Sequence, residues 1–203
     1  MKAYVYGANG PEITDVTKPV PKGTQVLVKV HACGLNRADL GMTKGHAHGA
    51  AGGVGTVLGM KHAFRAMRPG GAAGKGGAVV NIASVAATIA FPSIAVYSGT
   101  KSAVDRMTRV GAMEAGKLGY GVRVNCIYPG LIPTDMGMQL ANDIVKIGLA
   151  PDINAAVGSV VEQTPLGKLA EVSDIADAAV FLCSNDARFI TGIGLPVDGG
   201  MGM

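Results

Sequence analysis

The feature that most constrains the fold is a regular alternation of helical and strand-like segments from about Thr56 to the C-terminus. Apolar residues at helical spacing alternate there with short apolar runs bounded by glycine and proline. In chain order we predict a helix over 57–67, a strand over 78–83, a helix over 97–117, a strand over 122–127, a helical region over 134–161 interrupted by Pro151, a helix capped by Ser173 that ends at Leu182, and a strand over 195–198. Strands joined by helices in this way form parallel sheets covered on both faces. The sequence therefore predicts an α/β fold with a partial, doubly wound parallel sheet.

The first 55 residues have a different character. Strands are predicted over 2–6 and 25–30, and 45–55 is rich in glycine. We therefore divide the chain into a β-rich N-terminal segment with its glycine-rich junction, 1–55, and a second part, 56–203. Two interpretations of the junction stay open: its glycines bring backbone N–H groups and a helix N-terminus close to a phosphate, or they form a flexible joint. The joint is favoured because the residues directly before the glycines make a poor strand.

Composition narrows the possible functions. Aromatic residues make up only 4% of the chain, so the core must be built from aliphatic side chains and methionine. The net charge is +4 with lysines and arginines scattered along the chain, which does not indicate a nucleic-acid partner. The uncharged stretch 76–100 is interrupted by polar residues and proline, which argues against a membrane span. With no apolar leader at its start, the chain is expected to be cytoplasmic.

The pattern of cysteine and histidine predicts no metal site. Three cysteines lie far apart without a CxxC pair, and we expect them to be reduced, buried thiols: Cys33, Cys126 and Cys183. Three histidines near the junction have no cysteine or carboxylate at ligand spacing: His31, His46 and His48.

Three residues are spaced for proton transfer to or from a carbonyl oxygen. Tyr97 and Lys101 are four residues apart, which places them one turn apart on the same face of the predicted helix. An ammonium at that distance favours the phenolate form of a tyrosine, which can then exchange a proton near neutral pH. Ser84 ends a short apolar run thirteen residues before Tyr97, where its hydroxyl could orient a substrate oxygen. Each residue alone has an ordinary structural explanation, as solvated surface or as a turn.

Residues 56–203 resemble the short-chain dehydrogenase/reductase family. The motifs that carry the resemblance occur together and in the family's order: VNIAS ending at Ser84, the YxxxK pair of Tyr97 and Lys101, VRVN at 122–125, PGLIPT at 129–134 and LPVDGG at 195–200. The resemblance implies a Rossmann-like sheet and an NAD- or NADP-dependent interconversion of a secondary alcohol and a ketone. The small-molecule alcohol or ketone itself is not specified by the sequence.

The resemblance also assigns roles to individual residues. It implies that Ser84 positions the carbonyl, that Tyr97 is the general acid or base, and that Lys101 supports Tyr97 and binds the nicotinamide ribose. Tyr97 and Lys101 thus count both as catalytic and as cofactor-binding residues. The segment after the strand at 122–127 is implied to lie against the nicotinamide, through Pro129, Gly130, the backbone of Ile132 and the hydroxyl of Thr134. A homodimer or homotetramer is implied as well, formed through the helices at 57–67 and 97–117.

The chain departs from the family at its N-terminal side. It lacks the TGxxxGxG turn that holds the pyrophosphate, the residue that selects NAD or NADP, and the NNAG element. The family's catalytic asparagine would fall near Gly52, which has no side chain. Residues 1–44 instead resemble the start of zinc-free medium-chain quinone oxidoreductases, in MKA at 1–3, PVP at 19–21, VLVKV at 26–30 and GLNRAD at 34–39.

Two functions of different class follow. The first is a working oxidoreductase that uses Ser84, Tyr97 and Lys101. The second is a catalytically silent fusion, or truncated oligomerising module, that keeps these residues without a cofactor site. A quinone-reductase-like activity led by the first segment is a weaker third hypothesis. The substrate pocket is expected over 136–163, where aliphatic residues suit a small or alicyclic apolar substrate.

Overall fold

The computed structural model describes residues 2–7, 10–15 and 52–203. By its contacts the chain divides into two units, 1–30 and 31–203, which are described separately. The strand expected over 25–30, most of the glycine-rich junction, three histidines and Cys33 lie outside the described residues.

The described part of the first unit is an antiparallel hairpin. Strand β1 (Lys2–Gly7) pairs with β2 (Gly10–Asp15), with Lys2 opposite Asp15 and Gly7 opposite Gly10. The prediction of a first strand is confirmed, but β2 was not predicted. The sequence contains the common hairpin signal Asn9-Gly10, but in the observed register Gly10 already belongs to β2 and pairs with Gly7.

The described part of the second unit, 52–203, contains a parallel sheet of three strands in the order β3–β4–β5. The strands are β3 (Gly77–Ile82), β4 (Val122–Pro129) and β5 (Gly194–Val197). In register, Gly77 lies opposite Val122 and Cys126 opposite Gly194. The predicted parallel sheet is therefore confirmed, with β4 at its centre.

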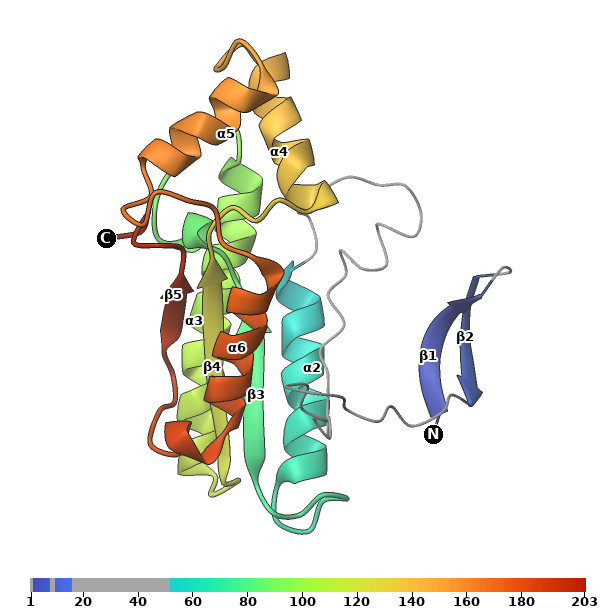
Figure 1. The fold of residues 1–203 in the computed structure, drawn as a ribbon. Coiled ribbons are helices and arrows are strands. Elements are labelled where there is room, and N and C mark those ends of the chain that lie inside the picture. The colour runs from blue at the N-terminus through green and yellow to red at the C-terminus, as the bar shows by residue number, and fades with distance from the viewer. Residues whose placement is uncertain (1, 8–9, 16–51) are drawn as a thin grey trace, which may run out of the picture. The chain divides into compact units, whose positions relative to one another are not determined.

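Helices cover both faces of this sheet, as a doubly wound fold requires (Figure 1). Helices α2 (Gly52–Met67) and α3 (Ala95–Lys117) pack on one face and α6 (Val172–Cys183) on the other. Alternation along β4 explains the division, because successive side chains point to opposite faces. Val124 packs in a buried cluster with residues of α2 and α3, whereas the Arg123 side chain reaches the C-terminal end of α6.

The core between these two helices and the sheet is built mainly from methionine, alanine and valine, as suits a chain with few aromatic residues. Its buried members are Met60, Ala63, Met67, Ala112, Ala115, Val122 and Val124. Phe64 and Tyr120 close its margin with rings edge to face and centroids 5.8 Å apart. The prediction from composition, a core of aliphatic side chains and methionine, is confirmed for this cluster.

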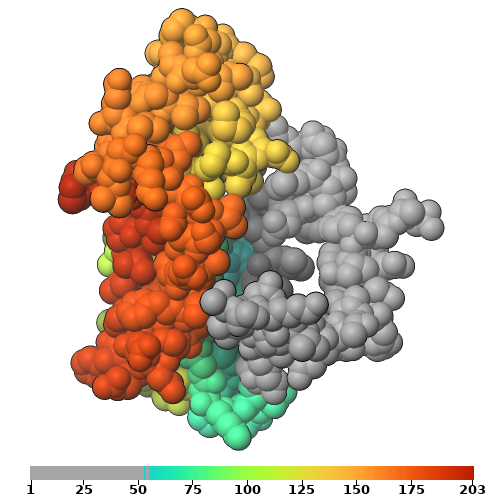
Figure 2. All heavy atoms as spheres, in the orientation of Figure 1, coloured from blue at the N-terminus to red at the C-terminus, as the bar shows by residue number. Residues whose placement is uncertain are grey.

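Two helices stand over the end of the sheet at which the strands terminate. Helix α4 (Asp135–Lys146) follows β4, and α5 (Ile153–Glu162) follows after Pro151. Figure 2 shows this pair as the mass at one end of the second unit. The predicted interruption at Pro151 is confirmed, because the two helices are separate and Asp152 caps the second one. Short 3₁₀ turns, η1 (Val85–Ala87) and η2 (Asn185–Ala187), complete the described elements.

Three finer predictions need correction. Helix α2 begins at Gly52, within the stretch predicted as a glycine-rich junction. Ser173 is not the N-cap of α6, because Glu171 occupies that position and its N–H donates to the Asp174 carboxylate at 2.7 Å. Cys126 is buried as expected, but Cys183 is exposed at the last turn of α6.

Arg123 offers a test of how α6 is held on the sheet. Its guanidinium donates to the carbonyl oxygens of Leu182 at 2.7 Å and Ser184 at 3.1 Å. These carbonyls lie at the end of a helix, where no intrahelical N–H is available to them. We expect Arg123→Met to lower the free energy of unfolding by about 2 kcal/mol in urea titrations. Arg188→Met, at an exposed arginine close by, should change it little; equal losses in the two variants would contradict this account.

Candidate functional site

Parallel pairing brings the functional candidates to one edge of the sheet. Ser84 follows β3, Gly130 follows β4 and Asp198 follows β5. Since all three strands run the same way, these positions share the carboxyl edge, where α/β sheets bind their ligands.

Ser84 is buried at this edge, with 8% of its surface exposed. Its Oγ accepts a hydrogen bond from the Ala86 N–H at 3.2 Å and so caps the short turn η1. This bond uses an acceptor lone pair and leaves the hydroxyl hydrogen to be donated elsewhere. Ser84 can therefore cap this turn and still donate a hydrogen bond to a substrate oxygen.

Tyr97 and Lys101 lie in the first turns of α3. The Lys101 Nζ is 5.7 Å from the centroid of the half-buried Tyr97 ring, as the four-residue spacing predicts. The same ammonium donates to the Ile82 carbonyl at 3.0 Å, which ties the start of α3 to the end of β3. The structure therefore brings Lys101 both to Tyr97 and to the strand end that leads into Ser84.

The connection between η1 and α3 carries local backbone strain. Ser93, four residues before Tyr97, has a φ of 71°, in the left-handed region that non-glycine residues rarely adopt. Such strain costs about 1–3 kcal/mol and is concentrated at functional sites. The start of the helix is also fixed by Ser102, whose hydroxyl donates to the Ala87 carbonyl at 3.0 Å.

The segment after β4 is held to the end of β5. The Gly130 N–H donates to the Val197 carbonyl at 3.1 Å, and the backbone passes so close to Asp198 that a Cβ at Gly130 would lie 3.0 Å from its Cα. Thr134 caps α4: its Oγ accepts from the Gly137 N–H at 3.3 Å. The four candidates Pro129, Gly130, Ile132 and Thr134 therefore run along the same edge as Ser84.

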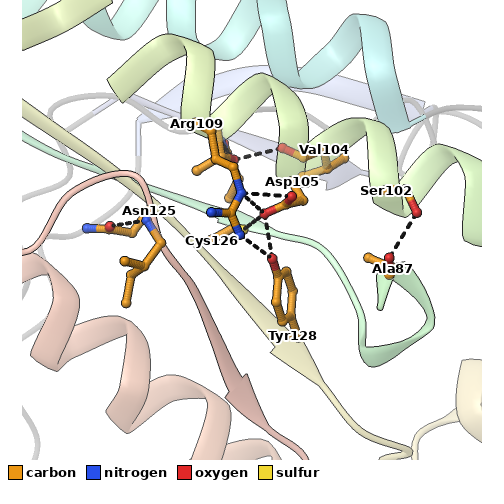
Figure 3. A network of polar contacts seen from close by, with 11 residues as sticks. Ala87, Ser102, Val104, Asp105, Arg109, Asn125, Cys126 and Tyr128 are labelled. Carbon is orange, nitrogen blue, oxygen red and sulfur yellow. Dashed lines mark hydrogen bonds and ion pairs between the residues drawn. The ribbon is translucent and has the colours of Figure 1, made fainter. Parts of the chain in front are cut away.

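Beneath this edge lies a polar network that the sequence reasoning missed (Figure 3). The Tyr128 hydroxyl donates to Asp105 Oδ1 at 2.5 Å, and Arg109 Nε donates to both carboxylate oxygens at 2.9 Å. Arg109 Nη2 lies 3.5 Å from the Tyr128 oxygen, and Cys126 Sγ lies 3.9 Å from Asp105 Oδ1. The spacing of Asp105 and Arg109, one helical turn apart, was a visible signal for the ion pair. Nothing in the sequence indicated that a strand tyrosine would join it.

Burial and hydrogen bonding shift the pKa values in this network. Burial acts to raise the pKa of Asp105, but hydrogen bonds from Arg109 and Tyr128 outweigh it and hold that pKa below its ordinary value of 3.8. Burial raises the pKa of the Cys126 thiol to about 11. Burial and then the Asp105 carboxylate raise the pKa of Tyr128. The network is therefore an ionised carboxylate between a cation and two neutral donors at neutral pH.

Within residues 2–7, 10–15 and 52–203, no cluster of three or more His, Cys, Asp or Glu side chains could hold a metal ion. In the same part of the chain, no helix is long and apolar enough to cross a membrane.

Comparison with known proteins establishes the family. Residues 51–202 match the family model described as enoyl-(acyl carrier protein) reductase. The 2-(S)-hydroxypropyl-CoM dehydrogenase 3 of Xanthobacter autotrophicus is 31% identical over 205 residues, which cover 97% of this chain and 75% of that protein. The chain belongs to the short-chain dehydrogenase/reductase family, as its motifs predicted.

Other relatives match a shorter region. The trans-4-hydroxycyclohexanecarboxylate dehydrogenase of Sinomonas cyclohexanicum is 36% identical over 72% of this chain and 48% of that protein. An NAD⁺-bound xylitol dehydrogenase structure is similar with a TM-score of 0.58 and 28% identity, over 61% of this chain and 48% of the other. An NADH complex of 7α-hydroxysteroid dehydrogenase gives a TM-score of 0.58 and 28% identity, over 74% and 52%. The chain thus spans about half the length of these three proteins.

Asp105 gives the network a pH dependence with a defined sign. Its folded pKa is depressed, so the ionised form contributes stability that is fully present above the unfolded value, about 3.9, and is lost as pH falls through the lower folded value. We expect Asp105→Asn to cost a constant free energy of unfolding above about pH 5, and that cost to shrink below about pH 4. Urea titrations at pH values above and below this range measure it. Asp177→Asn, at an exposed position, is the control and should change the free energy of unfolding little; a cost for Asp105→Asn that does not change with pH would contradict the assignment.

Proposed function

We propose that the chain is an NAD- or NADP-dependent oxidoreductase that interconverts a secondary alcohol and a ketone, with 56–203 as its catalytic half. The observation that carries the proposal is the arrangement at the carboxyl edge, where Ser84, the Tyr97–Lys101 pair and the segment Pro129–Thr134 follow adjacent strands. Family relatives named as alcohol dehydrogenases and sugar reductases support the reaction class, among them the D-erythrulose reductase of Gallus gallus.

The residues at this edge suit a nicotinamide ring. Gly130 presents backbone without a side chain, and Lys101 supplies a cation beside the strand end. We propose that Pro129, Gly130, Ile132 and Thr134 hold the nicotinamide, and that Tyr97 and Lys101 contact its ribose. When bound, the nicotinamide supplies or accepts a hydride at C4.

The protein's own chemistry is then the handling of one proton. The Ser84 hydroxyl donates to the substrate oxygen and orients it. In the direction of reduction, the Tyr97 O–H gives its proton to that oxygen as the carbonyl carbon is reduced; in oxidation the phenolate takes the proton back. The Lys101 ammonium lies 5.7 Å from the centroid of the Tyr97 ring, one turn further along α3.

The substrate pocket is proposed between the sheet edge and the α4–α5 pair. Leu140, Ile144 and Val145 are half-buried on α4 and offer aliphatic contacts without charge. Such a lining suits a small or alicyclic apolar alcohol. Two relatives are named for alicyclic alcohols with a six-membered ring, one of which also carries a carboxylate.

The alternative is a catalytically silent protein of the same fold. It is favoured by one observation, a relative named inactive 2-(S)-hydroxypropyl-CoM dehydrogenase 2 that is 41% identical over 62% of this chain. Binding of the dinucleotide separates the alternatives. Calorimetry that detects neither NAD(H) nor NADP(H) at millimolar concentration would remove the enzyme proposal.

Tyr97→Phe tests the proton transfer directly. It removes the hydroxyl and keeps the ring next to Lys101, so we expect ketone reduction to fall by at least about 10²-fold while the fold and dinucleotide binding persist. The assay follows oxidation of NADH and NADPH at 340 nm with a panel that includes cyclohexanone.

Tyr120→Phe is the matched control, because Tyr120 packs against Phe64 away from the sheet edge. It should leave the rate within about twofold of wild type, since it changes no group at the edge. Unchanged activity in Tyr97→Phe would exclude Tyr97 as the acid or base.

We further propose a homodimer or homotetramer that uses the surface formed by α2 and α3. A groove of about 540 Å³ runs between these helices, lined by apolar side chains such as Met60, Phe64 and Met107 together with charged ones, most of them basic. Beside it, apolar side chains of α3 are exposed, with Val110 49% and Met113 63% accessible. An exposed apolar surface next to such a groove is typical of an interface.

Met113→Glu tests this surface. A charge buried at the interface without a partner costs several kcal/mol, so we expect the variant to be monomeric by light scattering at concentrations where wild type is oligomeric. Leu149→Glu introduces the same charge at an exposed apolar residue between α4 and α5 and should leave the assembly intact. A monomeric wild type would rule out the proposed interface.

A further inference from the structure

We propose that Tyr128 is a positioning residue, which through Asp105 fixes the Pro129–Thr134 segment relative to the helix that carries Tyr97 and Lys101. This inference rests on the proposed function, since it concerns the alignment of the same site.

The location of Tyr128 is the first argument. It precedes Pro129, so its backbone leads directly into the segment proposed to hold the nicotinamide. Its hydroxyl donates a hydrogen bond of 2.5 Å to the Asp105 carboxylate. Asp105 lies on α3, one turn beyond Lys101 and two turns beyond Tyr97. One side-chain hydrogen bond thus joins the start of the segment to the helix with the proton-transfer residues.

The packing of the Tyr128 ring is the second argument. Tyr128 is 4% exposed and lies in one buried cluster with Ala83, Val104 and Cys126. Ala83 directly precedes Ser84, and Val104 lies on α3 one turn beyond Lys101, so the ring packs against both the strand end and the helix that carry the site residues. Gly194 on β5 makes room for the ring, because a Cβ there would overlap the Tyr128 Cζ and hydroxyl oxygen. The position of the ring is therefore determined by β3, α3 and β5 together.

The contacts of Asp105 make it possible to test positioning by Tyr128 separately from a general loss of stability. Without the Tyr128 hydroxyl, Asp105 keeps both hydrogen bonds to Arg109 Nε, and no buried charge is left unpaired. Tyr128→Phe therefore removes the tether at the end of β4 while it leaves the ion pair and the packing of the ring in place.

The first experiment measures kinetics of Tyr128→Phe with stereospecifically 4-deuterated NADH or NADPH. We expect kcat to fall roughly threefold to tenfold, because a small misplacement of reacting groups slows the chemical step. The primary deuterium isotope effect on kcat should rise as hydride transfer becomes more rate-limiting, while the dissociation constant of the dinucleotide changes less than about twofold. A purely structural role would not change the isotope effect.

Thr191→Val is the matched control. Thr191 Oγ accepts from the Val124 N–H at 3.0 Å, so the variant removes a hydrogen bond to the beginning of the same strand. It should lower the thermal midpoint by a similar amount and leave the isotope effect unchanged. Equal kinetic effects in Thr191→Val and Tyr128→Phe would overturn the proposal.

A second measurement does not depend on activity. Amide hydrogen exchange read by mass spectrometry should show faster exchange over 129–137 in Tyr128→Phe, and in Gly194→Ala, whose added methyl group displaces the ring. Thr191→Val should not show it. Unchanged exchange over 129–137 in both test variants would overturn the proposal even if the protein proves inactive. Faster exchange in a protein that binds no dinucleotide would instead overturn the proposed function and leave the structural tether established.

Discussion

Strand β4 is the element on which the rest of the second unit depends. It pairs with β3 on one side and β5 on the other, and its two faces bind different parts of the chain. On one face Asn125 donates to the Ile190 carbonyl and accepts from the Ile193 N–H, which fixes the return of the chain into β5. On the other face Tyr128 binds α3. Because these faces alternate residue by residue, a shift of one position in the register would exchange the two sets of partners.

Buried polar groups on this strand and on α3 help to fix how the helix and the strands are aligned. Asn125 and Thr108 are both fully buried, and each has hydrogen-bond partners within the chain. Thr108 also accepts from Asn81 at 2.9 Å, which ties β3 to α3. An unpaired group at such a position would cost about 1–3 kcal/mol, so arrangements of helix and strands that leave one of them unpaired are disfavoured. The position of Tyr97 and Lys101 is a consequence of this arrangement.

Features with a local cause could be predicted from the sequence. The helix and strand order followed from apolar spacing, the break at Pro151 from proline geometry, and the approach of Lys101 to Tyr97 from helical periodicity. Features that depend on distant residues could not be predicted. The bond from Tyr128 to Asp105 joins residues 23 apart and requires a glycine at position 194. The cap of α6 moved to Glu171 because the Asp174 carboxylate accepts from its N–H, a competition that a preference for serine does not reveal. The resemblance of residues 1–44 to quinone oxidoreductases stays a prediction, while the match to 2-(S)-hydroxypropyl-CoM dehydrogenase 3 covers 97% of this chain.

The affinity for a dinucleotide would show how much of the chain takes part in binding it. The residues proposed above to bind it lie only at its nicotinamide end: the segment Pro129–Thr134, Tyr97 and Lys101. A few hydrogen bonds there, each worth about 1 kcal/mol net, correspond to no better than about millimolar binding. Micromolar binding requires about 4 kcal/mol more, which is typical of a pyrophosphate held by backbone N–H groups at a helix N-terminus. Such contacts are not among those at the carboxyl edge; within the described residues, the N-terminus of α2 at Gly52 is one place that presents backbone N–H groups of this kind. Proton transfer and tight cofactor binding therefore depend on different residues in this proposal. The residues proposed for proton transfer lie together at the carboxyl edge, whereas micromolar binding of the dinucleotide needs contacts beyond that edge.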